Sequence, residues 1–522
     1  MTSDPPRPRW MLLAALLALG AAALAFVRLN PEFELKGLTT GLTLITLVLL
    51  AGAVGLWFAF VSRLPGRVRL GGSLAAVALI AGLALCVRVE GYYGDILPIL
   101  GWRWTPPRDY ALPDLKPAAA PAAEAAPAPE GAKIAATDWP RFLGPRGDGW
   151  ADVSDLPPDW AKQPPREAWR VACGAGWSGC AVAGGLVYTQ EQRGEKELVV
   201  CRDLKNGDVR WVHEAAARFS EEMGGDGPRA TPTVSGGFVY ALGATGLLHA
   251  LDAQTGTTRW TRDTLGESGQ PNLQWGKSGS PLVIHDLVVV TLGGKPETTT
   301  AAFHALTGEP AWRAGNDKSS YSTPALGTLG GREQLVVVYA DSVAAHDPAG
   351  GAELWRFAWP GAPAKVASPQ FVDAERVLIT VGYGLGAKML KVTPPAAEGQ
   401  PWSVAQVWHS LDMKTKFTNA LVKGAHAYGL DEGRLACIAL ADGKRTWKDE
   451  NFGHGQVIGA GDALIVQSER GEVVLVAADP GAYRVLQRIP ALTSKTWNYP
   501  ALAGKHLLVR NDRELVCYRW GE

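Results

Sequence analysis

The chain has 522 residues, and its 51 Lys and Arg balance 51 Asp and Glu, so the formal net charge is zero. This balance excludes the strongly basic surface of a dedicated nucleic-acid-binding protein, and a hydrophobic content of 47% excludes disorder over most of the length. The 61 Gly, 36 Pro and 20 Trp indicate many turns and many aromatic anchors, which favours short strands over a helical enzyme.

Three apolar stretches begin the chain, and each has about the 20 residues that a helix needs to cross a membrane. Within a membrane region at residues 1–104, the predicted helices cover residues 11–29, 40–61 and 70–88. Basic residues precede the first stretch and fill the loop after the second: Arg7, Arg9, Arg63, Arg67 and Arg69. The positive-inside rule therefore predicts a cytoplasmic N-terminus, with everything after the third helix on the other side of the membrane.

Residues 105–136 are rich in Pro and Ala, as in "KPAAAPAAEAAPAPEG". This composition cannot build a hydrophobic core and is typical of an extended, semi-rigid spacer. We expect a linker here, followed by a separate domain at residues 137–522.

The rest of the chain consists of repeated units, of which residues 232–260, "PTVSGGFVYALGATGLLHALDAQTGTTRW", are the clearest. Each unit has two β-rich runs joined by a Gly turn, and most end in Gly-x-x-x-Trp. Repeats of about 40–50 residues with several short strands are typical of propeller blades. We expect one Trp in the outer strand of most blades to pack between neighbouring sheets. These are Trp169, Trp211, Trp260, Trp312, Trp355, Trp408 and Trp447.

The two ends of the repeat region complement one another. The last unit stops after two or three strands, whereas "REAWRVACG" carries Trp169 in the outer-strand pattern with no inner strands before it. The N-terminal strand is therefore predicted to complete the C-terminal blade, which removes the open sheet edges. Counting the units predicts an all-β, eight-bladed propeller; seven blades remain the alternative, because the fifth and seventh units are irregular.

The segment "VYALGATGLLHALDAQTGTTRW" resembles the pyrroloquinoline-quinone (PQQ) repeat, and "DWPRFLGPRGDG" at 138–149 resembles the opening of bacterial PQQ-like propellers. The resemblance covers residues 137–522 and implies the quinoprotein alcohol dehydrogenase-like superfamily. One branch of that superfamily contains dehydrogenases that bind PQQ and Ca²⁺ over the central channel. Another contains non-catalytic propellers, such as the lipoprotein scaffold of the outer-membrane barrel-assembly machine.

The enzyme branch fits this sequence poorly. Many quinoprotein alcohol dehydrogenases carry two adjacent cysteines over the cofactor, and this sequence has no such pair. No acidic residue at the channel can be assigned as a Ca²⁺ ligand or as the catalytic Asp base, so neither catalytic residues nor a cofactor are assigned. We expect a non-catalytic scaffold in the bacterial inner membrane, with a periplasmic propeller that binds an envelope protein or a small anionic ligand. The alternatives are a PQQ-dependent dehydrogenase that donates electrons to membrane quinone, with PQQ and Ca²⁺ as its cofactors, and a ligand-sensing domain.

The segments that lead into the innermost strands contain recurring basic and aromatic residues, which we expect at the channel mouth. The candidate ligand-binding residues are Trp177, Arg229, Trp275, Lys277, Tyr321, Lys365, Lys416, Asn419, His454, Lys495 and Trp497. A ring of cations over a partly desolvated channel attracts anions, such as a small acid or an acidic peptide. The alternative is ordinary basic loops, because Asp226, Asp317 and Asp412 lie close enough in the sequence to neutralise several of these cations.

Two cysteines and the histidines complete the candidate groups. Cys173 and Cys180 lie in a segment predicted to be extracytoplasmic, where a disulfide can form, but spacing alone is equally compatible with two free thiols. The nine His show no metal-ligand spacing, so we predict no metal site.

Overall fold

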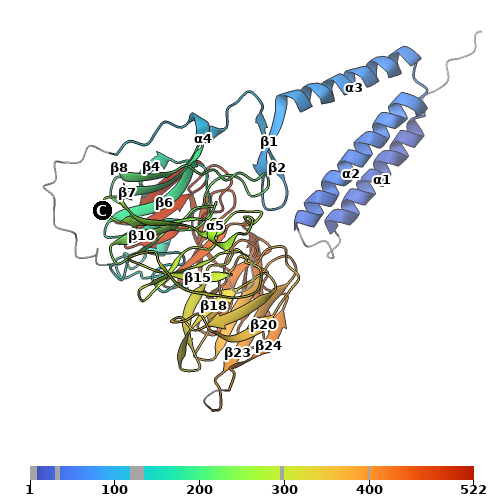
Figure 1. Cartoon of the computed structure of the whole chain (residues 1–522). Coiled ribbons are helices and arrows are strands. Elements are labelled where there is room, and N and C mark those ends of the chain that lie inside the picture. Colours follow the sequence, from blue (N-terminus) through green and yellow to red (C-terminus); the bar gives the residue numbers. More distant parts are fainter. Residues whose placement is uncertain (1–8, 30–35, 118–133, 294–298, 398–399, 522) are drawn as a thin grey trace, which may run out of the picture. The chain divides into compact units, whose positions relative to one another are not determined.

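The structure is a computed structural model that describes residues 9–29, 36–117, 134–293, 299–397 and 400–521 (Figure 1). The chain divides into two compact units. The first contains Met1–Pro107 with Glu222–Gly225, and the second contains Arg108–Glu221 with Asp226–Glu522.

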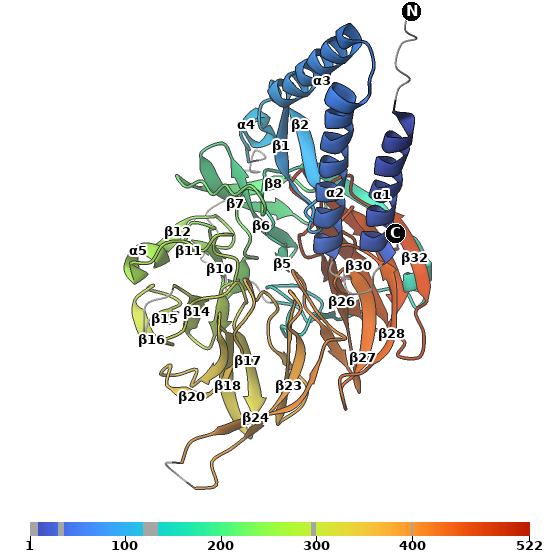
Figure 2. The same ribbon diagram turned by 90° about the vertical axis from the view of Figure 1, so that its right-hand side faces the viewer.

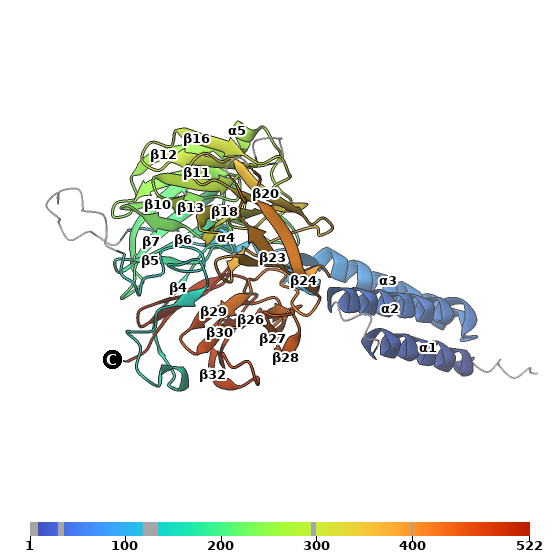
Figure 3. The same ribbon diagram turned by 90° about the horizontal axis from the view of Figure 1, so that it is seen from below.

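Three long apolar helices dominate the first unit: α1 (Trp10–Leu29), α2 (Lys36–Leu56), which continues as the π-helical turn η2 (Trp57–Val61), and α3 (Gly66–Cys86). The helices α1 and α2 lie side by side (Figures 2 and 3). By length and hydropathy, Trp10–Leu29, Thr39–Val61 and Gly66–Cys86 could each cross a membrane, which confirms the three predicted apolar helices. The third begins at residue 66 rather than at residue 70.

A two-stranded hairpin follows α3 directly and was not predicted. It pairs β1 (Val87–Tyr92) with β2 (Pro98–Trp102) in antiparallel register, with Val87 opposite Trp102. The Trp102 ring stacks on Trp104, with centroids 5.0 Å apart.

The second unit is an eight-bladed β-propeller, which confirms the predicted fold and excludes the seven-bladed alternative. Each blade has four antiparallel strands that follow one another from the channel outwards. Blade one contains β5 (Ala181–Ala183), β6 (Leu186–Arg193), β7 (Lys196–Asp203) and β8 (Val209–Ala215). Blade two contains β9 (Thr233–Ser235), β10 (Phe238–Leu242), β11 (Leu247–Asp252) and β12 (Thr258–Asp263). Blade three contains β13 (Leu282–Ile284), β14 (Leu287–Thr291), β15 (Thr300–His304) and β16 (Pro310–Ala314).

The remaining blades repeat this arrangement. Blade four contains β17 (Ala325–Leu329), β18 (Arg332–Val338), β19 (Ser342–His346) and β20 (Glu353–Ala358). Blade five contains β21 (Gln370–Phe371), β22 (Arg376–Val381), β23 (Gly386–Thr393) and β24 (Ser403–Ser410). Blade six contains β25 (Leu421–Lys423), β26 (His426–Asp431), β27 (Arg434–Ala439) and β28 (Arg445–Asn451). Blade seven contains β29 (Gln456–Ala460), β30 (Ala463–Gln467), β31 (Glu472–Ala477) and β32 (Val485–Pro490), and β3 (Trp150–Ala151) adds to its inner edge.

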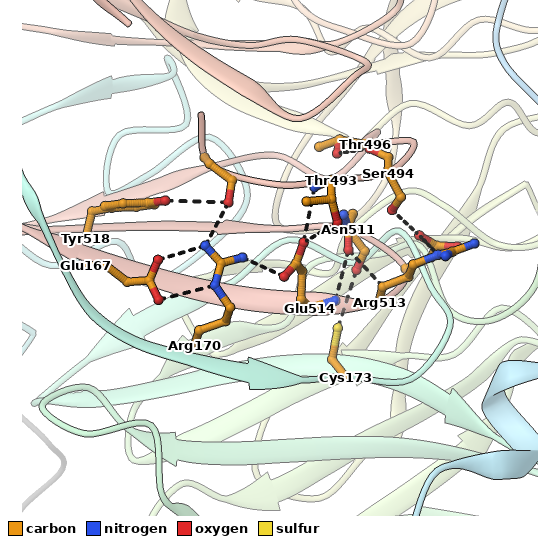
Figure 4. Close-up of polar contacts among 12 residues, drawn as sticks. Glu167, Arg170, Cys173, Thr493, Ser494, Thr496, Asn511, Arg513, Glu514 and Tyr518 are labelled. Atoms are coloured by element: carbon orange, nitrogen blue, oxygen red, sulfur yellow. Dashed lines mark hydrogen bonds and ion pairs between the residues drawn. The ribbon is translucent and has the colours of Figure 1, made fainter. Parts of the chain in front are cut away.

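Blade eight closes the ring with strands from both ends of the propeller. It contains β33 (Ala501–Ala503), β34 (His506–Arg510), β35 (Glu514–Arg519) and, outermost, the N-terminal strand β4 (Arg166–Ala172). Trp169 pairs with Cys517, and the Arg170 guanidinium bridges Glu167 on its own strand at 2.7 Å and Glu514 on β35 at 2.5 Å (Figure 4). This pairing, which the sequence predicted, covers the edge of β35 and joins the two ends of the propeller in one blade.

Outer-strand tryptophans connect consecutive blades. In six of the eight junctions the indole Nε1 of one blade donates to a carbonyl oxygen in the turn between the third and fourth strands of the next blade. The pairs are Trp169–Leu204, Trp211–Ala253, Trp260–Ala305, Trp312–Pro348, Trp408–Leu440 and Trp447–Asp479, at 2.8–3.1 Å. Trp355 differs, because its Nε1 donates to the side chain of Gln334 in its own blade at 2.7 Å.

Short polar side chains connect the innermost strands around the channel. In blades two to four, the Thr231 N–H donates to Ser280 Oγ and the Ser280 N–H donates to Thr323 Oγ1, both at 2.9 Å. Amides continue the ring: the Ser368 N–H donates to Asn419 Oδ1 at 2.6 Å, and Asn498 Nδ2 donates to the carbonyl oxygen of Ser178 at 2.8 Å across the closing junction. These bonds hold the innermost strands in a fixed register around the channel.

Residues 137–151, the channel loop, lie against the inner strands of the propeller before the chain reaches β4. The loop forms backbone or indole hydrogen bonds with blades eight, one, two, six and seven. The partners are Thr137 with Gly504, Trp139 with Val182, Pro140 with Val234, Trp150 with Val422 and Gly149 with Gly459, at 2.8–3.0 Å. At its tip, Phe142 packs edge-to-face on Tyr499, with centroids 4.8 Å apart. The loop therefore lies against the inner strands or inner turns of five of the eight blades.

Three short helical turns complete the second unit: α4 (Arg108–Ala111), the 3-10 turn η3 (Trp160–Lys162) and α5 (Thr264–Ser268). The turn α4 docks on the propeller through Asp109, whose carboxylate lies 2.6 Å from the Arg218 guanidinium. Arg108 donates to the carbonyl oxygen of Arg513 at 2.6 Å. Most of the predicted linker, residues 118–133, lies outside the described residues.

Candidate channel-mouth site

The mouth is the channel end at which the innermost strands begin. Because neighbouring strands are antiparallel, the loops between the second and third strands of each blade lie at the same end. The segments that lead into the innermost strands therefore gather with the loops at residues 193–196, 382–385, 432–433 and 468–471. This explains why residues from all eight blades can reach one site.

The first of two aromatic–cation clusters, which we call the Lys495 cluster, joins blades one, six, seven and eight. Lys495 Nζ lies 4.7 Å from the ring centroid of Trp177 and 4.1 Å from that of Trp497. The Trp497 ring in turn packs on Phe417, with centroids 5.1 Å apart, and Phe417 packs on His454 at 5.5 Å. A cation between two indole faces is stabilised by the ring quadrupoles, most strongly where water is partly excluded.

Lys416 extends this cluster to blade five. Its Nζ lies 5.1 Å from the Phe417 centroid and 5.3 Å from that of Tyr383, in the loop between β22 and β23. Lys416, Phe417 and Tyr383 are half-buried, so the cluster presents both charge and aromatic surface to solvent.

The second cluster, which we call the Arg229 cluster, lies on blades two to four. The Arg229 guanidinium lies over the Phe219 ring, 4.5 Å from its centroid. Phe219 also contacts the backbone at Gly276, and the neighbouring Trp275 packs on Tyr321 with centroids 5.5 Å apart. The structure thus brings eight of the eleven predicted mouth residues into these two clusters.

The other three predicted residues have different surroundings. Lys277 and Lys365 are each 1% exposed, and their ammonium groups donate to the backbone carbonyl oxygens of Leu292 and Ala340. Asn419 lies in the ring of inner-strand hydrogen bonds and donates to Tyr499 Oη at 2.5 Å. These contacts tie loops and strands together, so Lys277 and Lys365 are buried and bonded to the backbone outside the two clusters. Their spacing matches the repeat, but spacing carries no measure of burial.

The three aspartates considered as neutralising partners pair with other cations. Asp226 lies 2.9 Å from Arg218, Asp317 lies 3.8 Å from Arg356, and Asp412 lies 3.4 Å from Arg445. At the mouth itself, Glu469 accepts a hydrogen bond from Trp497 Nε1 at 2.7 Å. This carboxylate orients the indole that covers Lys495.

Burial shifts the titration of several mouth groups. It lowers the pKa of Lys495 to about 8 and that of Arg229 to about 10, because desolvation disfavours the charged forms. It raises the pKa of Glu197 to about 7 for the same reason, although the backbone N–H of Ala244 opposes this shift. Burial also raises the pKa of Glu432. An anion bound here would stabilise the charged forms of Lys495 and Arg229.

The residues at the mouth do not fit the Ca²⁺ of a quinoprotein dehydrogenase. Calcium needs six to eight converging oxygen ligands. Among the described residues, no group of three or more His, Cys, Asp or Glu side chains could hold a metal ion. The mouth carboxylates Glu197, Glu432 and Glu469 come from separate blades, and Glu469 bonds to an indole.

Cys173 and Cys180 are both free thiols in the structure, and they form no disulfide with each other. Cys173 Sγ donates to the carbonyl oxygen of Asn511 at 3.4 Å (Figure 4). Burial raises the pKa of the two thiols to about 12 and about 11, respectively, so both are protonated at neutral pH.

Three residues that build the clusters were not predicted from the sequence: Phe219, Tyr383 and Phe417. Phe417 directly follows Lys416 in the segment "TKFTNA", so the alternation of cation and aromatic was visible there. Phe219 and Tyr383 lie far from the repeat motif in sequence, and only the blade arrangement brings them to the mouth.

Comparisons with known proteins agree with this architecture. The PQQ_2 family model, described as outer membrane protein assembly factor BamB, matches residues 161–315, 296–451 and 431–518. A search of curated proteins finds no similar sequence.

Solved structures share the fold at low sequence identity. Quinohemoprotein alcohol dehydrogenase from Comamonas testosteroni is 14% identical, with a TM-score of 0.54 over 74% of this chain and 82% of that one. Quinohemoprotein alcohol dehydrogenase ADHIIG from Pseudomonas putida HK5 is also 14% identical, with a TM-score of 0.50 over 74% and 80%. BamB from Moraxella catarrhalis is 13% identical, with a TM-score of 0.47 over 68% and 100%. Because the family matches span well over half of the residues, the chain belongs to the PQQ_2 family of BamB-like propeller proteins.

Proposed function

We propose that this protein is a membrane-anchored, non-catalytic scaffold of the bacterial envelope, and that its channel mouth binds an acidic segment of a partner protein. The observation that carries the proposal is the Lys495 cluster, in which cations lie against partly exposed aromatic rings. Trp and Tyr are among the residues most enriched in protein-binding hot spots, and cations beside them favour a partner of opposite charge.

The chemistry of the mouth supports binding rather than catalysis. The carboxylates there do not converge, and among the described residues they form no metal-binding group. Lys416 instead carries a half-buried cation beside the ring of Phe417, and Lys495, which is 5% exposed, lies against the rings of Trp177 and Trp497. A peptide with alternating Glu and aromatic residues would complement both features.

The membrane orientation is part of the same proposal. With Arg7 and Arg9 before the first helix and three crossings, the propeller would lie in the periplasm. Alkaline phosphatase fused after residue 522 should be active in cells, because it folds only where its disulfides can form. An inactive fusion, with an active cytoplasmic reporter at the same site, would contradict this orientation.

Binding is tested with the full chain in detergent and a fluorescein-labelled peptide of alternating Glu and Phe. We expect Lys416→Gln with Lys495→Gln to weaken binding at least tenfold, and added salt to weaken the native protein's binding. The matched control is Lys391→Gln with Lys423→Gln, which removes two cations from other parts of the propeller, where they pair with Glu375 and Asp462. Equal affinity of both double variants would refute the mouth as the binding site.

A further inference from the structure

The hairpin formed by β1 and β2 has one apolar face. Val87 pairs with Trp102, and Val89 pairs with Leu100. Side chains of directly opposite residues lie on the same face of a two-stranded sheet, and so do residues two apart along one strand. These four apolar side chains therefore share one face of the hairpin.

The opposite face of the hairpin is polar. Arg88 pairs with Gly101 on this face, and its guanidinium forms an ion pair with Glu90 at 3.0 Å. A Cβ at Gly101 would overlap the Glu90 carboxylate, so the glycine leaves room for this charged group on the neighbouring strand. The hairpin is thus amphipathic, with both of its charged side chains on one side.

The apolar face is open to its surroundings. Val89 is 49% exposed, Leu100 is 62% exposed and Trp102 is 51% exposed. Trp104, which is 66% exposed, extends this face because its ring stacks on that of Trp102. Single exposed apolar residues are ordinary, but a contiguous patch of them marks a surface that another molecule covers.

The hairpin is fixed to the end of α3. Its first strand begins at Val87, directly after the helix ends at Cys86 (Figure 1). After the second strand, the Arg103 N–H donates to the carbonyl oxygen of Cys86 at 2.8 Å. Arg103 Nε also donates to the carbonyl oxygens of Ala84 and Val87, at 3.2 and 3.1 Å. Because the last carbonyls of a helix have no partner within it, Arg103 both caps α3 and holds the hairpin against it.

The length of α3 places this face at the edge of a bilayer. The uncharged part of the helix, residues 70–86, is ~25 Å long, whereas a hydrocarbon core is ~30 Å thick. The pair of Val89 and Leu100 lies two strand residues beyond the helix, which is ~7 Å. Each interfacial layer of a bilayer is ~5–8 Å thick, so the whole apolar face falls within the hydrocarbon edge and the interface.

From this geometry we propose that the apolar face of the hairpin lies on phospholipid in the membrane interface. Val89 and Leu100 would contact acyl chains, and the stacked rings of Trp102 and Trp104 would lie at the level of the headgroups, where Trp is enriched. The ion pair of Arg88 with Glu90 would face water. The inference rests on the membrane anchoring in the proposed function and adds a second contact with the bilayer, made by strands. It is independent of peptide binding at the mouth.

The test places a nitroxide spin label on either face of the hairpin in the full chain, reconstituted in liposomes of phosphatidylethanolamine and phosphatidylglycerol. The background variant Cys86→Ala removes the half-buried thiol, and the five remaining cysteines are buried. Leu100→Cys labels the apolar face, and Glu90→Cys is the matched control on the polar face. Oxygen concentrates in hydrocarbon, whereas a neutral nickel chelate stays in water. The ratio of oxygen to nickel accessibility should be about fivefold higher at residue 100 than at residue 90.

A label at Leu79→Cys, near the middle of the uncharged part of α3, separates this inference from the anchoring itself. If residue 79 reports lipid and residues 100 and 90 give equal ratios, the hairpin does not lie on the bilayer and the anchor stands. Low access of both reagents to residue 100 would mean that protein covers this face, and would overturn the proposal as well. A label at residue 79 that reports water would overturn the anchoring and the hairpin contact together.

Discussion

The indole of Trp211 in blade one lies on Gly256 of blade two and donates from Nε1 to the carbonyl oxygen of Ala253 at 3.0 Å. A Cβ at Gly256 would lie 2.5 Å from the indole, and Gly256 has φ of +73°. The Gly and the Trp of the repeat motif therefore meet across the junction between blades. The glycine is required both by its left-handed backbone and by the tryptophan of the preceding blade.

Gly256→Ala should lower the stability of the propeller by about 2–4 kcal/mol. The alanine would have to adopt a left-handed backbone conformation, and its Cβ would clash with the Trp211 indole in a packed interface. Gly236→Ala is the matched control: it also has positive φ, +57°, but no atom lies within 4 Å of its Cβ position. That control should cost only about 1–2 kcal/mol. Chemical denaturation of the native protein and both variants measures the difference, and equal losses would contradict the interface role of Gly256.

Lys277 should make stability depend on pH. Burial lowers its pKa from 10.5 to about 7, so between these values the unfolded chain binds a proton that the folded protein does not. The free energy of unfolding should therefore rise with pH in this window, by up to ~1.4 kcal/mol per pH unit. Lys277→Met should remove this contribution and be more stable than the native protein at pH 7. A native-minus-variant difference that does not change between pH 7 and 10 would contradict the burial of this ammonium group.

Arg218 should control the docking of α4 on the propeller. Its guanidinium lies between Asp109 and Asp226, and Asp109 is 6% exposed. Arg218→Met leaves a nearly buried carboxylate unpaired, at a cost of about 2–3 kcal/mol, so hydrogen exchange at residues 108–115 should accelerate. Adding Asp109→Asn should restore much of the protection. If the single and double variants exchange equally fast, the ion pair does not hold this segment.

Cys173 and Cys180 should resist alkylation in the folded protein. Both are buried, and burial raises their pKa values to about 12 and about 11, so almost no thiolate is present at pH 8. Mass spectrometry after iodoacetamide treatment should find both unmodified until denaturant is added. Half-buried Cys86 provides the internal comparison. Rapid modification of Cys173 without denaturant would show that the closing blade opens readily.

The sequence by itself determined the repeat, the closing strand and the three apolar helices, and it favoured eight blades over seven. These features follow from local patterns: the Gly-x-x-x-Trp motif marks the end of a blade, and an uninterrupted apolar run marks a helix that could cross a membrane. The cationic and aromatic residues of the mouth were also visible, because they precede the innermost strands in most repeats.

Only the tertiary structure decided which of those residues face a common site. Lys277 and Lys495 occupy similar repeat positions, yet one donates to the carbonyl oxygen of Leu292 and the other lies between two indoles. The position of the channel loop depends on contacts between residues far apart in sequence, such as Trp150 with Val422. A repeat motif encodes how one blade packs on the next, whereas burial and the partners of each side chain depend on the closed ring of blades.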